Sequence, residues 1–105
     1  MFTARFVVLH HTGIAQPHYD LLFELDADSP LPTARCSQWP PSPATQFQRI
    51  ADHRRNYLEY EGEISGGRGN VKQIASGSCQ VEMNGEDSFL LSFDAGFKLR
   101  IPPRN

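Results

Sequence analysis

The chain of 105 residues is 39% hydrophobic, 21% charged and 10% aromatic, which is typical of one globular domain and not of a disordered segment or coiled coil. Its net charge of −2 excludes a protein that coats nucleic acid through bulk positive charge, so any nucleic-acid contact has to be local. The two cysteines, Cys36 and Cys79, lack the density of a disulfide scaffold and the spacing of a zinc knuckle, so we expect reduced thiols. No apolar run reaches the roughly 20 residues that span a bilayer, and the first eleven residues lack the anatomy of a signal peptide. We therefore expect a single domain over residues 1–105 in a cytoplasmic protein with no membrane partner.

Short segments of alternating character predict strands in the first half of the chain. Residues 5–10 are apolar and rich in β-branched side chains, and residues 19–25 carry hydrophobic side chains at every second position. The segment 29–45 is rich in proline, which lacks a ladder donor and restricts the residue before it. We expect it to be mostly loop, with one short strand at 34–39.

The second half continues the same pattern. Further alternating segments lie at 71–75, 79–83, 89–93 and 97–101, with turns predicted at Asn84-Gly85 and Ala95-Gly96. The three glycines of segment 65–69 predict a hairpin loop. Helix is expected only as one or two turns within 43–54. The fold class that follows is all-β, a small closed antiparallel β-barrel, because closure removes exposed edges.

Three of the four histidines and one carboxylate fall within eleven residues, in His10-His11 and His18-Tyr19-Asp20. On a strand, His18 and Asp20 project from the same face, and His11 at the end of the preceding strand adds a third ligand. Two imidazoles and one carboxylate leave positions open for water and substrate, which suits Mn²⁺, Fe²⁺ or Zn²⁺ in a catalytic site. Spacing alone leaves ordinary surface or hydrogen-bonded histidines as the alternative.

A second cluster, from Asp52 to Tyr57, combines an imidazole, a phenol and two guanidinium groups. His53 is suited to donate a proton or to bind phosphate as a cation, and Tyr57 to donate a hydrogen bond to the same oxyanion. The guanidinium fork of Arg54 or Arg55 matches phosphate. The competing interpretation is a solvated loop followed by a half-buried tyrosine.

Taken in order, these segments resemble the 3′-phosphoesterase domain of the bacterial and archaeal DNA ligase D family and its small free-standing relatives. The resemblance covers most of the chain, and it rests on Phe6-Val7-Val8-Leu9-His10-His11, on His18-Tyr19-Asp20 through Glu24-Leu25, on Trp39-Pro40, on Asp52-His53 with Tyr57, and on Tyr60-Glu61-Gly62 with the glycine loop. It implies a small antiparallel β-barrel that removes 3′-terminal ribonucleosides and 3′-phosphates with Mn²⁺ during DNA end repair.

By this resemblance the metal ligands are His11, His18 and Asp20, and the phosphate-directed pair is His53 and Tyr57. The family usually carries an arginine two residues after the metal-binding aspartate, where this chain has Leu22, and a lysine where this chain has Pro40-Pro41. Compensating phosphate ligands are expected among four arginines: Arg49, Arg54, Arg55 and Arg68.

These observations favour a metal-dependent phosphoesterase acting on nucleic-acid 3′ ends, as a monomer, beside a ligase or polymerase partner. Mn²⁺ is the expected cofactor, with other divalent metals as alternatives. The second hypothesis is a weak or inactive β-barrel module that binds phosphorylated ends or a repair protein, because Leu22 removes a phosphate ligand. A third hypothesis, a non-haem iron centre, needs a cosubstrate pocket that the sequence does not indicate.

Overall fold

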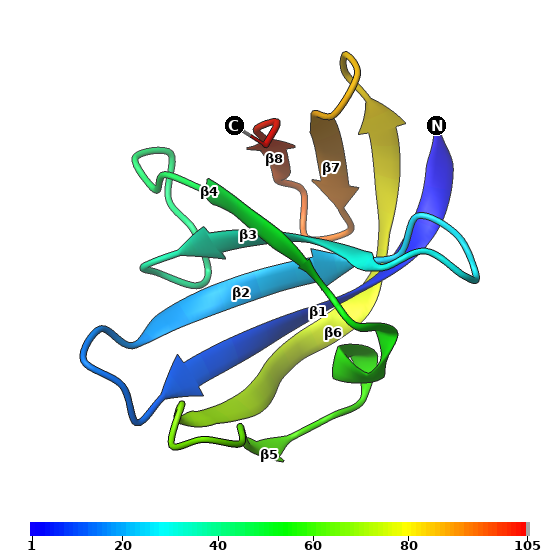
Figure 1. Cartoon of the computed structure of the whole chain (residues 1–105). Coiled ribbons are helices and arrows are strands. Elements are labelled where there is room, and N and C mark those ends of the chain that lie inside the picture. The colour runs from blue at the N-terminus through cyan, green and yellow to red at the C-terminus, as the bar shows by residue number, and fades with distance from the viewer. Residues whose placement is uncertain (105) are drawn as a thin grey trace.

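The computed structural model describes residues 1–104 and consists mainly of β-strands (Figure 1). The strands are β1 (Phe2–Thr12), β2 (His18–Phe23), β3 (Leu31–Cys36), β4 (Gln48–His53), β5 (Gly62–Glu63), β6 (Asn70–Met83), β7 (Phe89–Phe93) and β8 (Lys98–Ile101). One short 3₁₀ helix, η1 (Arg55–Leu58), is the only helix among the described residues. Within this part of the chain, no helix has the length and apolar character needed to cross a membrane.

The strands form one antiparallel sheet in the order β4-β3-β2-β1-β6-β7-β8, with β5 added alongside β6. The sheet curls into a half-barrel, in which the long strands β1 and β6 lie at the centre (Figure 1). The predicted all-β antiparallel fold is thereby confirmed. Backbone pairing ends at β4 on one side and β8 on the other, so within the described residues a backbone ladder does not close the barrel.

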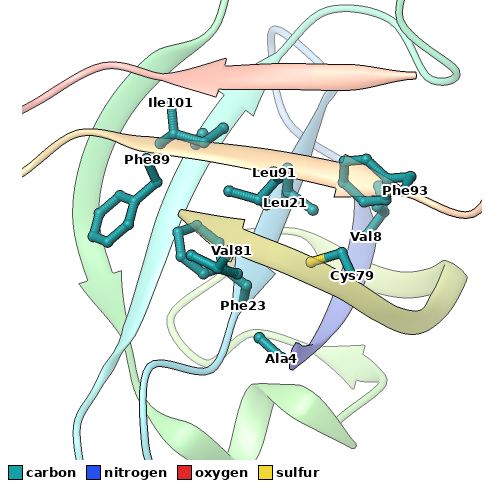
Figure 2. Close-up of a cluster of buried hydrophobic side chains, with 11 residues drawn as sticks. Ala4, Val8, Leu21, Phe23, Cys79, Val81, Phe89, Leu91, Phe93 and Ile101 are labelled. Atoms are coloured by element: carbon teal, nitrogen blue, oxygen red, sulfur yellow. The ribbon is translucent and has the colours of Figure 1, made fainter. Parts of the chain in front are cut away.

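The concave face of the sheet holds the main hydrophobic core. Side chains from six strands meet there, as Figure 2 shows for Val8, Leu21, Phe23 and their neighbours from β6 and β7. Cross-strand pairs such as Val8 with Leu21 place both members on this face, because directly paired residues share a face of the sheet. Burial of this apolar surface is the main stabilising contribution to the fold.

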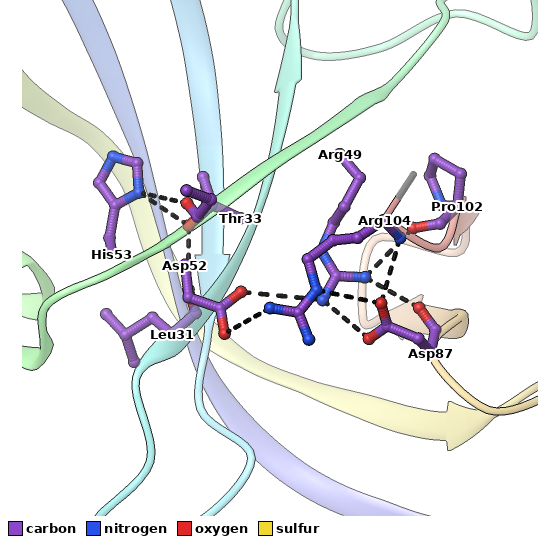
Figure 3. A network of polar contacts seen from close by, with 9 residues as sticks. Leu31, Thr33, Arg49, Asp52, His53, Asp87, Pro102 and Arg104 are labelled. Atoms are coloured by element: carbon purple, nitrogen blue, oxygen red, sulfur yellow. Dashed lines mark hydrogen bonds and ion pairs between the residues drawn. The ribbon is translucent and has the colours of Figure 1, made fainter.

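Side chains join the two ends of the sheet. Arg49 of β4 donates through Nη1 to the backbone oxygens of Asp87 (2.9 Å) and Pro102 (3.2 Å), and through Nη2 to Asp87 Oδ1 at 3.1 Å. Arg104 lies 3.6 Å from Asp52 of β4 and also binds Asp87 (Figure 3). This seam of ion pairs and hydrogen bonds replaces strand pairing between β4 and the β7–β8 end.

A second, smaller core lies on the opposite face of β1, β2 and β3. Tyr57 and Ile64 pack against its six buried residues. These six are Val7, Leu9, Leu22, Leu31, Leu58 and Val71. Leu58 comes from η1, which therefore covers this face. The helical turn expected within 43–54 instead begins at Arg55, because β4 occupies half of that segment. The strand expected at 34–39 runs from Leu31 to Cys36.

Candidate metal centre and adjoining cleft

His11, His18 and Asp20 lie together on the face that carries the second core. His11 is paired directly with His18 across β1 and β2, and Asp20 is paired with Leu9 of that core. Direct pairing puts these side chains on one face. Each residue offers one ligand atom, and the three atoms lie within 4.8 Å of one another. The neighbouring His10 points to the other face, where its ring stacks on Tyr19 at 4.4 Å.

His18 presents an unpartnered nitrogen to this cluster. Its Nδ1–H donates to the carbonyl oxygen of Gln16 at 2.9 Å, which leaves the lone pair on Nε2. Nε2 is buried, has no hydrogen-bond partner among the described residues, and lies 3.6 Å from Asp20 Oδ2. Burial lowers the pKa of His18, so the ring is held in the neutral form that binds metals. Buried polar atoms without a partner are uncommon, and the lone pair of this nitrogen is available to bind a cation.

The glycine loop orients His11. Its Nε2–H donates to the carbonyl oxygen of Arg68 at 2.7 Å, so the lone pair of the ring is on Nδ1. A Cβ atom at Gly69 would lie 2.9 Å from His11 Nε2 and 2.4 Å from the Thr12 oxygen, and φ at Gly69 is +93°. Only glycine fits there without displacing the histidine. A backbone partner that fixes the tautomer of a histidine is a common outer-shell feature of metal sites.

Asp20 is the charged centre of the cluster. It is 2% exposed, and its carboxylate accepts hydrogen bonds from Arg35 Nε (2.9 Å) and Nη2 (3.3 Å). Arg35 is the residue of β3 paired directly with Asp20. Nε2 of His53 lies 3.9 Å from Asp20 Oδ2. The Arg35 guanidinium therefore compensates the burial of the carboxylate, and the two neutral imidazoles place their Nε2 lone pairs beside it.

His53 reaches the cluster from β4. The hydroxyl of Thr33 donates to the Leu31 oxygen at 3.0 Å, so toward His53 it acts as acceptor, and His53 Nδ1–H donates to it at 3.0 Å (Figure 3). The lone pair of His53 is then on Nε2, the atom nearer Asp20. Desolvation lowers the pKa of His53, so its ring is neutral near neutral pH.

A bulge opposite the proline of β3 places His53 on this face. The register between β3 and β4 shifts by one residue between Leu31 and Thr33, at Pro32, so that His53 lies opposite Leu31. Proline cannot donate to a ladder and is found at bulges, and bulges re-aim side chains near functional sites. Asp52, one residue earlier, joins the seam with Arg49 instead.

Tyr57 lies beside His53 and lines a cavity. The two rings meet edge to face with centroids 5.3 Å apart. Tyr57, Arg54 and Arg68 line this cavity of about 400 Å³ together with Glu63. The Arg68 side chain is held by the Ser65 oxygen at 2.7 Å.

Two of the four arginines predicted to bind phosphate are engaged elsewhere. Arg49 is 2% exposed, belongs to the seam, and pairs with Ala34 of the main core, on the face opposite the cluster. Arg55 binds Glu24 and the backbone oxygens of Asp26 and Ser29, which fastens η1 to the loop after β2.

Arg35, by contrast, lies at the cluster and was not among the sequence candidates. The signal that could have found it is its place in the strand expected at 34–39, opposite the strand that carries Asp20. Leu22, where the family pattern has an arginine, is fully buried in the second core. A guanidinium at that position would enter an apolar environment.

No protein-family model matches this sequence, and a search of curated proteins finds no significant match. The assignment of the cluster therefore depends on its own geometry. The donor set of two imidazoles and one carboxylate, with an orphaned nitrogen among them, fits a divalent cation with open coordination positions.

Proposed function

We propose that the protein is a divalent-metal-dependent phosphoesterase that trims 3′-phosphates or 3′-ribonucleosides from DNA ends, with Mn²⁺ as its cofactor. The observation that carries this proposal is the convergence on Asp20 of the orphaned His18 nitrogen and the His53 nitrogen, at 3.6 and 3.9 Å, with His11 beside them. In this proposal the protein acts in the cytoplasm as a monomer on nucleic-acid 3′ ends, beside a ligase or polymerase.

In this proposal, His11, His18 and Asp20 would hold the cation. Two further residues would transfer a proton or donate a hydrogen bond. A bound divalent cation polarises a phosphate oxygen and lowers the pKa of a nearby water. The sequence predicts that His53 donates a proton or binds phosphate as a cation. Because burial keeps its Nε2 unprotonated, it would instead accept the proton of the attacking water, while its Nδ1–H stays on Thr33 and fixes the ring. The phenol of Tyr57 donates a hydrogen bond to the charge that develops on the phosphate.

A binding module without catalysis is the second candidate. Two observations favour it: Arg35 already binds both carboxylate oxygens of Asp20, and Leu22 offers no guanidinium. In such a module the protein recognises a phosphorylated end and releases it unchanged.

The deciding experiment incubates the purified protein and Mn²⁺ with duplexes that carry a recessed 3′-phosphate or a 3′-terminal ribonucleotide, and separates the products by electrophoresis. The proposal expects removal of the terminal group, abolished by EDTA and by His18→Ala. His10→Ala is the matched control, because it removes a histidine from the same hairpin on the opposite face. Tight binding without product would support the module, and an undiminished rate in His18→Ala would exclude the metal assignment.

A further inference from the structure

A cleft of about 800 Å³ opens beside the metal cluster. It lies between the loop of residues 13–17, the end of β3 and the start of β4, and His18 and Arg35 form part of its wall. Among the described residues that line it, none is acidic. The protein has a net charge of −2, but the only charged side chain among the described residues that line this cleft is the Arg35 guanidinium, beside the His18 imidazole and the Cys36 thiol. This local balance favours an anionic ligand.

Arg35 is suited to receive that anion. Its side chain is 35% exposed, whereas the Asp20 carboxylate that it binds is 3% exposed. The hydrogen bonds to Asp20 use Nε and Nη2, so the Nη1 group remains for a ligand in the cleft. A guanidinium presents five donors in a planar fork, which matches a phosphate as well as a carboxylate.

The rest of the lining suits an uncharged organic group attached to the anion. Phe47 is half-buried on the main core and lines the cleft, and the amide side chains of Gln46 and Gln48 lie beside it. An aromatic face stacks with a nucleobase, and amide groups donate to and accept from base edges and sugar hydroxyls.

We propose that this cleft binds the terminal nucleoside 3′-phosphate, with Arg35 as the phosphate-binding arginine and Phe47 against the base. The inference rests on the proposed function, since it places the phosphate next to His11, His18 and Asp20.

The Arg35–Asp20 ion pair also couples the phosphate to the cation. A phosphate bound at Nη1 partly neutralises the guanidinium and so weakens its attraction to Asp20. The carboxylate is then freer to bind a cation, so a cation and a phosphate favour each other's binding. Thermodynamic linkage makes this effect reciprocal: the ligand tightens metal binding by the same factor as the metal tightens ligand binding.

Binding without turnover tests the proposal. The probe is a thymidine analogue whose 3′-phosphate is replaced by a methylenephosphonate, so that no ester bond can be cleaved. Calorimetry measures its affinity with and without Mn²⁺, beside inorganic phosphate and unmodified thymidine. We expect the analogue to bind more tightly than either of these, and Mn²⁺ to strengthen its binding.

Three variants locate the contacts. Arg35→Gln is expected to weaken the analogue about tenfold or more, as for the loss of a charged hydrogen bond, and to abolish the coupling to Mn²⁺. Arg35→Lys keeps the charge without the fork and is expected to fall between. Arg100→Gln, which removes an exposed guanidinium from β8, is the control for net charge and should bind as the wild type does. Phe47→Leu should weaken the analogue and leave inorganic phosphate unaffected.

The outcomes separate this inference from the proposed function. If folded Arg35→Gln, checked by circular dichroism, binds the analogue as the wild type does, the inference is wrong even where the protein cleaves 3′ ends. If thymidine binds as tightly as the analogue, the cleft has no phosphate site. If the expected binding pattern appears in a protein that cleaves nothing, the inference stands and the phosphoesterase proposal fails.

Discussion

Alanine substitutions at two glycines of the loop before β6 can isolate how this loop positions His11. Gly67 and Gly69 have φ values of +69° and +93°, so each alanine incurs the left-handed backbone penalty of about 1–2 kcal/mol. A Cβ at Gly67 meets no atom within 4 Å, whereas one at Gly69 would lie 2.4 Å from the Thr12 oxygen and 2.9 Å from His11 Nε2. Forcing these atoms apart adds about 1–3 kcal/mol, the usual cost of overpacking.

Urea unfolding measures this difference directly. We expect Gly69→Ala to lower the free energy of unfolding by about 1–3 kcal/mol more than Gly67→Ala does. Metal binding supplies the second measurement: because the displaced ring loses its Arg68 contact, Gly69→Ala should weaken Mn²⁺ binding by about 10–100-fold, the usual effect of losing an outer-shell partner. Equal stabilities of the two variants, with equal Mn²⁺ affinities, would refute the reasoning.

Three further predictions concern other parts of the fold. Leu22→Arg, which introduces the arginine typical of ligase D phosphoesterase domains, should destabilise the protein by about 2–4 kcal/mol in urea unfolding, because it buries a charge in the second core; unchanged stability would contradict that placement. Hydrogen bonds from Arg104 lower the pKa of Asp87, so the ionised carboxylate stabilises the fold above its unfolded pKa of about 3.9, and this stabilisation is lost as the pH falls through the lower folded pKa. The gap in melting temperature between wild type and Asp87→Asn should therefore shrink from pH 7 to pH 2.5, and a constant gap would count against the seam. Burial raises the pKa of Cys79 to about 11, so a thiol reagent at pH 8 should modify it slowly in the folded protein and quickly in urea; equal rates would show that the thiol is accessible.

Local alternation was enough to predict most strands, because apolar side chains recur at every second position within each segment. It failed where a bulge changes which face a residue occupies. In β6 the pairing shifts so that Val8 faces Ala75 while Leu9 faces Gln73, and Ile74 between them is left exposed. The alternation in the sequence places residues before and after this bulge on one face of the sheet. In the structure, those on one side of the bulge face the main core and those on the other side face the second core. No sequence feature of the segment marks that shift.

The candidate site shows the same division between local and long-range information. That His18 and Asp20 share a face follows from their spacing, and the pairing of His11 with His18 follows from a hairpin with a short loop. The partnership of Asp20 with Arg35 depends on the register of a third strand, and the approach of His53 depends on a bulge in a fourth. Such register relations are set by packing over the whole sheet, so single-sequence periodicity does not contain them.

The arrangement of the two cores explains how a sheet this small can maintain a buried carboxylate. The main core fills the concave face and supplies most of the apolar burial, so the opposite face of β1, β2 and β3 can accommodate polar groups at its end. On this face, Val7 and Leu9 lie in the same row of side chains as His11 on β1. Leu22 lies in the same row as Asp20 on β2. The leucines exclude water on one side of Asp20, and the cleft opens on another, at Arg35. An anion reaching this centre from the cleft would consequently meet the guanidinium next to the buried carboxylate, which is the order of contacts that the proposed coupling between phosphate and cation requires.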